Sequence, residues 1–365
     1  MKYVSVTFDP SFNFNSPESW YARTEGYAGI LYCLAKNNTV INIKQINYGG
    51  DCLHKGVQYR FVNFYRENTW FPRKLYQYIK GLEPGIVLVQ GLHNPFKLIQ
   101  LGMKLPKRVK IIVQHHAEKP GKGIKRYLHR IADHFVDAYL FASQELGAGW
   151  VKNGSISSAK KVHEVMEVSS IFSPMDKTAA RKKTGVTGDK VFLWVGRLND
   201  NKDPLTVTRA FLKFSAQQPL AKLYMIYHTD ELFQQVQQTI DASGQKNAIT
   251  LIGNVPHAEL QYWFSSADII LSGSHYEGSG TAICEAMSCG CMPVVTNISS
   301  FRMITDGGKC GLLYQPGNES ELFSALNQTL VMDIEEKQKL SLEYFKASLS
   351  FEAIAGRIQE IAAAL

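Results

Sequence analysis

Two glutamates frame a short polar segment in the second half of the chain. The stretch HYEGSGTAICEAMSCGCMPVV (275–295) holds Glu277 and Glu285, which are separated by seven residues around Ser-Gly-Thr at 279–281. This pattern predicts a helix that begins near 279–281, where glycine lets a ligand approach the free backbone N–H groups. Such N–H groups bind phosphate, whereas carboxylates repel phosphate and accept hydrogen bonds from hydroxyl groups. The segment therefore predicts a ligand in which phosphate is flanked by hydroxyl-rich groups.

A second segment, VGRLNDNKDP (195–204), directly follows the apolar run VFLWV. Asp203 is a favourable helix N-cap, and Pro204 suits the first helical position. Arg197 and Lys202 are therefore expected beside a helix N-terminus, whose dipole is positive and disfavours cations unless an anion is shared. A diphosphate is such an anion. The alternative is that both are solvated basic residues in a loop between a strand and a helix.

The two glutamates fit the groups on either side of a diphosphate. We expect Glu277, in the loop, to contact a hexose, and Glu285, in the helix, to contact a ribose. Glu285 lies within AICEAMS, an apolar segment whose helix is expected to be buried. A buried carboxylate without partners is costly, so a surface glutamate is the weaker alternative for this position.

The composition limits the class of protein. The chain has 365 residues, of which 45% are apolar and 20% are charged, as in globular proteins of two domains. No apolar stretch approaches the roughly 18 residues that span a bilayer, and Asp9 and Pro10 come too early for a signal peptide. Six cysteines occur without a C-x-x-C pair, which predicts free thiols in the reducing cytoplasm.

Positive charge is concentrated in the first half of the chain. Residues 1–168 hold 23 basic and 12 acidic residues, a net charge of +11, whereas residues 169–365 hold 17 and 20, a net of −3. Nine cations and one acid, Glu118, lie between Lys104 and Arg130. This region is either an ordinary solvated face or a surface for anions, such as membrane lipid or a phosphorylated substrate. Nucleic acid is disfavoured because no nucleic-acid-binding motif accompanies the charge.

Short apolar runs alternate with helical patterns, and the alternation restarts after about residue 185. Such alternation predicts parallel, doubly wound α/β sheets, and the restart predicts two facing Rossmann-like domains with a ligand cleft between them. We expect an N-terminal domain over 1–170, a C-terminal domain over 171–348, and a helix over 349–365 that packs back on the N-terminal domain. The predicted strands are 3–8, 40–46, 86–90, 109–114, 138–142, 191–195, 223–227, 249–253, 268–272 and 292–296.

Glu277-x7-Glu285 together with VGRLNDNKDP resembles the retaining glycosyltransferases of family 4, which have the GT-B fold. The resemblance runs from about Lys190 to Tyr314, includes IGNVPHAELQYWFSSADIILSGS and GGKCGLLYQPGN, and is weaker over residues 1–168. It implies that Arg197 and Lys202 hold a donor diphosphate, and that Glu285 and Glu277 bind the ribose and the transferred sugar. The family needs no metal, and the sequence has no D-x-D motif. The implied donor-binding residues are Gly196, Arg197, Lys202, Asn254, Val255, Glu277, Gly278, Ser279, Gly280, Thr281 and Glu285, with Asn254 and Val255 beside the nucleobase.

Two adjacent histidines end a strand in IIVQHHAEKPGKG (111–123). A histidine at this place contacts the donor sugar in the family that the chain resembles. Neighbouring residues of a strand point to opposite faces, so one of His115 and His116 is expected in the cleft. The spacing His-x-x-x-Pro favours His116. A zinc site is disfavoured because no third ligand is evident.

The resemblance implies transfer of a sugar from a nucleotide-diphosphate donor to an acceptor hydroxyl, with retention of configuration and without a resident cofactor. The acceptor is expected to be a glycan or a lipid-linked molecule of cell-envelope polysaccharide, glycolipid or related glycan synthesis. Catalytic roles are expected for Glu277, His116, Arg197 and Lys202. The alternatives are a nucleotide-sugar 2-epimerase and a non-catalytic GT-B partner subunit. We expect a cytoplasmic protein, at the inner face of the membrane if the basic region binds lipid.

Overall fold

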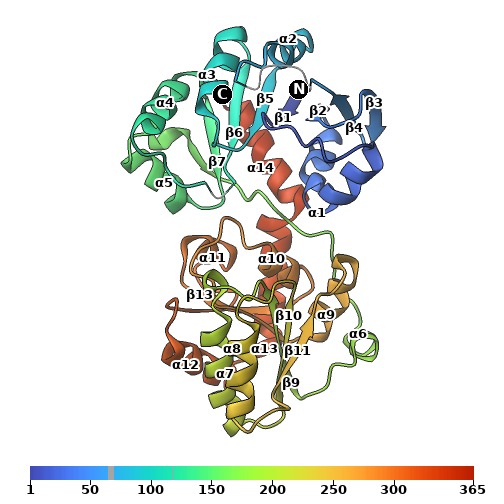
Figure 1. Ribbon diagram of the computed structural model, residues 1–365, viewed down its shortest axis with the longest axis vertical. Coiled ribbons are helices and arrows are strands. Elements are labelled where there is room, and N and C mark those ends of the chain that lie inside the picture. Colours follow the sequence, from blue (N-terminus) through green and yellow to red (C-terminus); the bar gives the residue numbers. More distant parts are fainter. Residues whose placement is uncertain (65–69, 117) are drawn as a thin grey trace. The chain divides into compact units, whose positions relative to one another are not determined.

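The computed structural model describes residues 1–64, 70–116 and 118–365. The chain forms two compact units (Figure 1). One unit comprises Met1–Ser169 together with Phe351–Leu365, and the other comprises Ser170–Ser350. Within the described ranges, no helix is both long and apolar enough to cross a membrane.

The first unit is built on one sheet with the strand order β3-β4-β2-β1-β5-β6-β7-β8. Neighbouring strands are parallel except for β3 and β4. The strands are β1 (Lys2–Val6), β2 (Thr39–Gln45), β3 (Gly50–His54), β4 (Val57–Val62), β5 (Ile86–Gln90), β6 (Lys110–Gln114), β7 (Ala138–Phe141) and β8 (Val162–Glu164). Its helices are α1 (Pro17–Ala35), α2 (Arg73–Gly81), α3 (Pro95–Lys104), α4 (Ile124–Ala132), α5 (Gln144–Lys152) and α14 (Phe351–Ala363).

The order of strands reverses beside β1. The chain runs from β1 to β2 on one side and returns to β5 on the other, with Val4 paired to both Ile41 and Val87. Parallel α/β sheets bind ligands at such a reversal, beyond the carboxyl ends of the strands. The apolar side chains of β1, β5 and β6 form the core beneath this edge.

The C-terminal helix α14 packs against α1 within the first unit. A Cβ atom on Gly29 would lie 2.4 Å from the Phe351 ring, so glycine permits this close approach. At the same contact, Lys36 Nζ lies 3.1 Å from Glu352 Oε1. The last helix is therefore part of the unit that contains the N-terminus.

The second unit has the strand order β11-β10-β9-β12-β13-β14, and all paired strands are parallel. Its order reverses between β9 and β12. The strands are β9 (Lys190–Gly196), β10 (Ala221–Tyr227), β11 (Ile249–Gly253), β12 (Ile269–Ser272), β13 (Met292–Thr296) and β14 (Leu312–Tyr314). The helices are α6 (Lys177–Thr184), α7 (Pro204–Gln217), α8 (Phe233–Ala242), α9 (Leu260–Ser266), α10 (Thr281–Ser288), α11 (Ser299–Ile304), α12 (Glu319–Gln328) and α13 (Ile334–Tyr344).

The ten strands predicted from the sequence are present to within about two residues at either end, but four others were missed. β3 and β4 form a hairpin whose turn residues, Lys55 and Gly56, have φ of 47° and 81°. Positive φ at both positions is typical of the tight turns that join such strands. β3 lies at the edge of the sheet, and its side chains alternate between half-buried and exposed. Its sequence therefore contains no continuous apolar run that would predict a strand. β8 and β14 have three residues each, which is too short for a periodic signal.

Candidate functional site

The loop after β9 places Lys202 and Asp203 at the start of α7. Asp203 has φ of 42°, and its Oδ1 accepts a hydrogen bond from Thr206 N at 3.2 Å. Asn199 Oδ1 accepts one from Lys202 N at 3.1 Å, which holds the short 3-10 helix Asp200–Lys202. Arg197 follows β9 directly and is exposed. It makes no ion pair with any residue of the described ranges.

Lys202 forms an ion pair with Glu277, which lies 75 positions later in the chain. Ser274 Oγ donates a second hydrogen bond to the same carboxylate oxygen of Glu277, at 2.7 Å. Both charged side chains are partly buried. The pair corrects one expectation: Lys202 at the positive end of α7 does not need a ligand anion for charge balance, because Glu277 supplies the negative charge.

The loops after β9 and β12 are tied together by one backbone hydrogen bond and one from the Asn201 side chain. His275 N donates to Asn201 O at 2.8 Å, and Asn201 Nδ2 donates to Tyr276 O at 3.0 Å. A Cβ atom on Gly273 would lie 2.9 Å from the carbonyl oxygen of Asp203, so glycine is required for this approach. The reversal between β9 and β12 thus holds Lys202 and Glu277 in one fixed arrangement.

Helix α10 begins beside Glu277. Its N-cap, Gly280, has φ of 60°, and a Cβ atom there would lie 2.7 Å from the Phe301 ring. The first intrahelical bonds run from Ile283 N and Cys284 N to Gly280 O, so the N–H groups of Thr281 and Ala282 have no intrahelical acceptor. The predicted helix start is therefore present, with Gly278 buried and Ser279 half-buried before it.

Glu285 lies on α10 with only 7% of its side chain exposed. His257 Nε2 lies 2.7 Å from Glu285 Oε1 and supplies the partner that a buried carboxylate needs. His257 begins a short turn after β11, three residues beyond the predicted base-contacting position Asn254. Asn254 is exposed and Val255 half-buried. His257 was not predicted as a site residue, because nothing in its local sequence links it to Glu285, 28 positions later.

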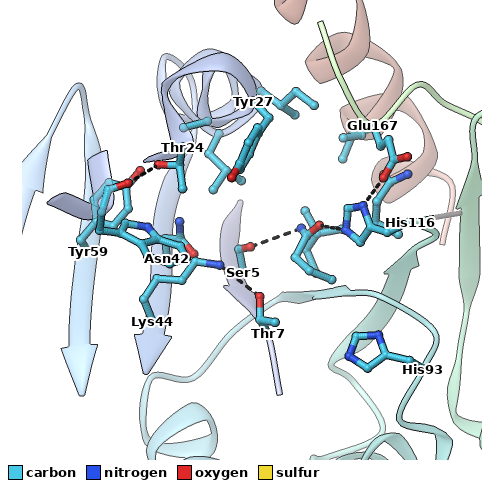
Figure 2. Close-up of a pocket in the computed structure, with 18 residues that line it drawn as sticks. Ser5, Thr7, Thr24, Tyr27, Asn42, Lys44, Tyr59, His93, His116 and Glu167 are labelled. Carbon is cyan, nitrogen blue, oxygen red and sulfur yellow. Dashed lines mark hydrogen bonds and ion pairs between the residues drawn. The ribbon is translucent and has the colours of Figure 1, made fainter. Parts of the chain in front are cut away.

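A pocket of about 270 Å³ lies within the first unit, between α1 and the central strands (Figure 2). His116 lines it, contacts the Glu167 carboxylate through Nδ1, and places Nε2 2.9 Å from Gln90 Oε1. His115 is buried instead, with its ring stacked on Phe141 at 4.6 Å and Nε2 2.8 Å from Glu118 O. The structure thus separates the two histidines: His116 faces a pocket, and His115 belongs to the core.

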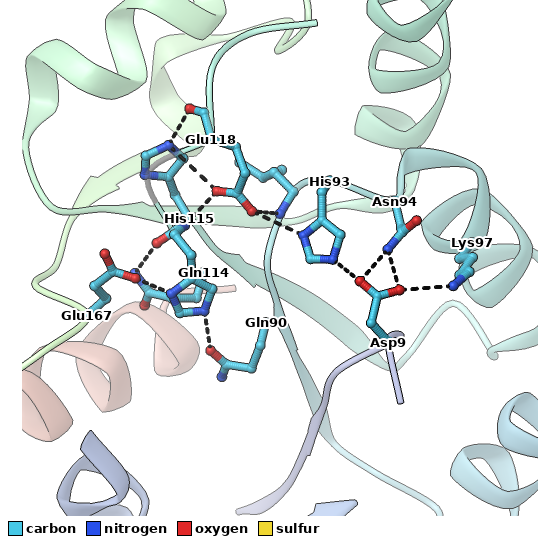
Figure 3. A network of polar contacts seen from close by, with 11 residues as sticks. Asp9, Gln90, His93, Asn94, Lys97, Gln114, His115, Glu118 and Glu167 are labelled. Carbon is cyan, nitrogen blue, oxygen red and sulfur yellow. Dashed lines mark hydrogen bonds and ion pairs between the residues drawn. The ribbon is translucent and has the colours of Figure 1, made fainter. Parts of the chain in front are cut away.

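A polar network connects the carboxyl ends of β1, β5 and β6 (Figure 3). His93 contacts Asp9 through Nε2 and lies 3.4 Å from Glu118 Oε1 through Nδ1. Glu118 also accepts hydrogen bonds from His116 N at 2.6 Å and Leu92 N at 2.5 Å. Lys97 Nζ lies 3.2 Å from the Asp9 carboxylate.

The network shifts the titration of its members. Hydrogen bonds to Asp9 and Glu118 raise the pKa of His93 to about 9. The hydrogen bond from His93 lowers the pKa of Asp9 to about 2. Burial opposes ionisation of Glu118, yet the hydrogen bonds from His93, His116 and Leu92 lower its pKa to about 2. Asp9, His93 and Glu118 are therefore charged at neutral pH. They lie beside His116, the histidine that the sequence favoured as a site residue.

The sequence analysis did not identify Asp9, Gln90, His93 or Glu167 as site residues. Their common signal is position, since Asp9, Gln90 and His93 lie at or just beyond strand ends that meet at the reversal in the sheet. His116 and its partners belong to the first unit, whereas Arg197, Lys202, Glu277 and Glu285 belong to the second. Within the described parts of both units, no group of three His, Cys, Asp or Glu residues is arranged to hold a metal ion.

The chain is similar to known proteins in sequence and in fold. The sequence pattern of the family "Glycosyl transferases group 1" matches residues 176–343. D-inositol 3-phosphate glycosyltransferase of Thermobispora bispora is 26% identical over 52% of this chain and 47% of its own. The GPI3 subunit of phosphatidylinositol N-acetylglucosaminyltransferase of Saccharomyces cerevisiae is 26% identical over 50% of this chain and 40% of its own. The chain therefore spans less than half the length of these curated relatives.

Solved structures match the chain over its full length. A glycosyltransferase from Rickettsia africae matches this chain with a TM-score of 0.75 at 16% identity. The match covers 100% of this chain and 97% of the Rickettsia chain. HepE of Anabaena, solved in complex with UDP, has a TM-score of 0.72 at 16% identity, with 100% of each chain covered. These matches confirm the predicted fold class, an α/β protein of two Rossmann-like domains as in GT-B glycosyltransferases.

Proposed function

We propose that the chain is a retaining glycosyltransferase that moves a sugar from a nucleotide-diphosphate donor to an acceptor hydroxyl. The observation that carries the proposal is the cluster at the reversal between β9 and β12. There a lysine, two carboxylates and a free helix N-terminus are held beyond the carboxyl ends of the strands. This is the place where parallel α/β sheets bind nucleotides. The match to the group 1 family over residues 176–343 supports the same reading.

Each predicted residue has a role in this proposal. Arg197, Lys202 and the N–H groups of Thr281 and Ala282 bind the diphosphate. Glu285, oriented by His257 Nε2 at 2.7 Å, accepts hydrogen bonds from the ribose hydroxyls. Glu277 accepts one from the transferred sugar and shares Lys202 with the diphosphate. The remaining donor contacts are assigned to Gly196, Asn254, Val255, Gly278, Ser279 and Gly280.

The reaction follows from where charge develops. The bond between the sugar carbon and the donor phosphate oxygen breaks, and a bond from that carbon to the acceptor oxygen forms on the same face. The acceptor proton passes to the departing phosphate oxygen, so no enzyme carboxylate acts as nucleophile. Arg197, Lys202 and the α10 N-terminus stabilise the negative charge that appears on the leaving diphosphate. His116 is proposed to contact the transferred sugar, with its ring oriented by Glu167 and Gln90.

The relatives suggest which substrates to test first. Anabaena HepE has been solved with UDP and with UDP-glucose, so uridine diphosphate sugars are the first donors to examine. The names of the curated relatives contain an inositol phosphate and a phosphatidylinositol. We propose an acceptor of glycolipid or cell-envelope glycan synthesis.

The deciding experiment measures donor binding and then product. The full chain is heated with UDP, UDP-glucose, UDP-N-acetylglucosamine and the matching GDP compounds, and the melting temperature is recorded. A ligand at a hundredfold excess over Kd stabilises the folded state by about 2.7 kcal/mol. The stabilising donor is then incubated with and without candidate acceptors. Conversion of the donor sugar without an acceptor would indicate an epimerase, and binding without any turnover would indicate a non-catalytic subunit.

We also propose that the first unit binds an anionic membrane through a surface on α3, α4 and the segments that precede α4. Ile124 and Tyr127 on α4 are 79% and 65% exposed, and Ile131 and Met103 are exposed as well. α3 packs against α4, so its exposed Met103 adds to this surface. The exposed cations between 104 and 130 are Lys104, Lys107, Arg108, Lys119, Lys122, Lys125, Arg126 and Arg130.

The surface combines the two features of interfacial helices, an exposed apolar face and surrounding cations. Ile124, Tyr127 and Ile131 recur at helical spacing. The acid of this region, Glu118, binds backbone N–H groups of the polar network instead of facing the cations. Lys110 lies 3.2 Å from Asp137 and does not belong to the surface. Residue 117 lies outside the described residues. An ordinary solvated face, the alternative from the sequence, does not account for the exposed apolar residues.

A further inference from the structure

The carboxylate of Glu277 has one occupied and one open oxygen atom. Lys202 Nζ and Ser274 Oγ both donate to Oε1, the serine at 2.7 Å. Among the residues that the structure describes, none donates a hydrogen bond to Oε2. Oε2 does not belong to the buried polar atoms that lack a partner, so a ligand can reach it. The protein thus holds one side of this carboxylate and leaves the other side for a ligand hydroxyl group.

Of the two partners of Oε1, Ser274 is held more firmly than Lys202. Ser274 is 1% exposed, whereas 26% of the Lys202 side chain is exposed. The hydroxyl group of Thr296, on β13, donates to the carbonyl oxygen of Ser274 at 2.5 Å. The hydroxyl group of Tyr314, on β14, donates to the carbonyl oxygen of Ser272 at 2.9 Å. Two neighbouring strands therefore fix the backbone segment that carries Ser274.

The hydroxyl groups of Ser272 and Ser274 form a chain of hydrogen bonds with one direction. A carboxylate accepts hydrogen bonds and donates none, so Ser274 gives its single hydroxyl proton to Glu277. Ser272 Oγ lies 3.1 Å from Ser274 Oγ, and it must donate in this contact because the proton of Ser274 is already used. Each bond of such a chain polarises the next. The chain therefore orients the Ser274 hydroxyl group toward Glu277.

We propose that Ser274 is a positioning residue, which holds Oε1 of Glu277 so that Oε2 accepts a hydrogen bond from the transferred sugar. The inference rests on the proposed function, in which Lys202 also binds the donor diphosphate. Lys202 then serves two anions, and its contact with Glu277 weakens when the donor is bound. Ser274 is the partner that Glu277 retains at that stage. The buried serine thereby keeps the carboxylate in place through the reaction.

Calorimetry and turnover on the full chain test the inference, with UDP, UDP-glucose and UDP-N-acetylglucosamine as probes. Ser274→Ala should leave UDP affinity unchanged, because neither Ser274 nor Glu277 is assigned to the nucleotide. Turnover should fall by about 10- to 100-fold, since a displacement of about 1 Å in a site has costs of this order. Ser215→Ala is the matched control and should change neither quantity. Ser215 is a buried serine of α7 whose hydroxyl group donates to Gln245 Oε1 at 2.8 Å.

A double-mutant cycle separates positioning of Glu277 from general support of the fold. In a Glu277→Ala chain there is no carboxylate to hold, so the added Ser274→Ala should lower turnover by no more than about twofold. The same cycle is read on the affinity for the UDP sugars relative to UDP, which requires no turnover. If Ser274→Ala does not bind UDP, Ser274→Cys replaces it in the cycle, because a thiol has a similar shape and is a weak donor.

Equal losses from Ser274→Ala with and without Glu277 would overturn the inference, because they would show that Ser274 acts through the fold. Full turnover of Ser274→Ala would overturn it as well. In both cases the unaltered chain still binds UDP and transfers sugar, so the inference alone is refuted. Absence of UDP binding and of transfer in the unaltered chain refutes the proposed function instead.

Discussion

At the scale of single residues, the candidate donor site is organised by one ion pair and one contact between a histidine and a carboxylate. Lys202 pairs with Glu277, and His257 with Glu285, across 75 and 28 positions of the chain. In both cases the carboxylate is partly or largely buried, so its partner affects stability as well as ligand binding. Substitutions at this site therefore change the stability of the empty protein as well as its ligand binding.

Lys202→Ala should weaken UDP binding by about 10- to 150-fold and barely affect uridine, because a charge-assisted contact to phosphate is lost. Repulsion between Lys202 and the positive N-terminus of α7, taken by itself, would make the empty variant more stable. The structure reverses this expectation: Glu277 would lose its partner, and the free energy of unfolding should fall by about 1 kcal/mol.

Calorimetry with UDP and uridine, together with urea unfolding, tests both parts. Arg197→Ala is the companion variant, since it should weaken UDP similarly without a loss of stability. If Lys202→Ala lost UDP and uridine affinity alike, Lys202 would support the fold and not contact phosphate.

Glu285→Gln should keep the fold and weaken UDP binding, because the amide replaces charge-assisted bonds to ribose with weaker ones. Glu277→Gln should instead lower turnover and leave UDP binding nearly unchanged, since its proposed contact is the transferred sugar. Turnover and calorimetry on both variants decide the assignment. An equal loss of UDP affinity in the two would show that the proposed division between ribose and sugar is wrong.

His93 should make stability depend on pH. Its pKa of about 9 in the folded chain exceeds the ordinary value of 6.5, so folding takes up a proton between these values. The resulting stability is present below about pH 6.5 and is lost as pH rises toward 9. Burial lowers the pKa of His129 to about 4 and that of Lys44 to about 8. His129 therefore makes stability depend on pH mainly below pH 6.5, and Lys44 mainly above pH 8.

The free energy of unfolding should therefore fall between pH 6.5 and 8 in the unaltered chain. His93→Asn should flatten this decline, whereas His134→Asn, an exposed histidine on the same unit, should retain it. Urea unfolding at several pH values within this window gives the slopes. Identical slopes in the unaltered chain and in His93→Asn would exclude proton uptake by the Asp9–His93–Glu118 network.

At the scale of elements, sites are made where loops follow strands. The loops after β9 and β12 are tied by a backbone hydrogen bond and by one from the Asn201 side chain, so side chains from separate segments keep a fixed geometry. α10 then presents its N-terminus from a glycine with φ of 60°, a conformation that side-chain-bearing residues rarely adopt. α4 differs from these elements because its apolar side chains Ile124, Tyr127 and Ile131 are not covered by other residues of the described chain.

Helix α4 should attach the chain to anionic vesicles. Flotation with phosphatidylserine-containing and neutral phosphatidylcholine liposomes should show binding to the former, which weakens as salt is raised. The double substitution Ile124→Ser with Tyr127→Ser should abolish flotation, because the apolar contribution is lost. Val331→Ser, at a residue of the other unit that is 87% exposed, is the control and should float as the unaltered chain does.

Equal partitioning to both kinds of liposome, or to neither, would return the region to an ordinary basic surface. Retained flotation of the double variant would show that the cations alone provide the attachment. Lys110→Met should have no effect in either case, since Lys110 pairs with Asp137.

At the scale of the whole molecule, the chain is two doubly wound units, each with a reversal in strand order. In the first unit the reversal lies beside β1, near Asp9, His93 and His116. In the second it lies between β9 and β12, near Lys202 and Glu277. Full-length matches to solved glycosyltransferases follow this plan at 16% identity, which shows that the fold tolerates extensive sequence change.

The sequence by itself determined what depends on neighbouring residues. Apolar runs predicted ten strands, Asp203 and Pro204 predicted the start of α7, and the glycine before Thr281 predicted the start of α10. These features follow from side-chain periodicity and capping, which act over one or two turns of chain. The same local patterns indicated that Arg197, Lys202, Glu277 and Glu285 come after strands or on a helix that follows one.

Only the tertiary structure decided which of these residues are partners. The pairing of Lys202 with Glu277, of His257 with Glu285, and of Asp9 with His93 depends on strands that are adjacent in space and distant in sequence. Strand order is set by how the helices cover both faces of each sheet, a non-local outcome that periodicity does not encode. For the same reason, the spacing His-x-x-x-Pro after β6 favoured His116 over His115, but only the tertiary structure showed that His115 is buried against Phe141.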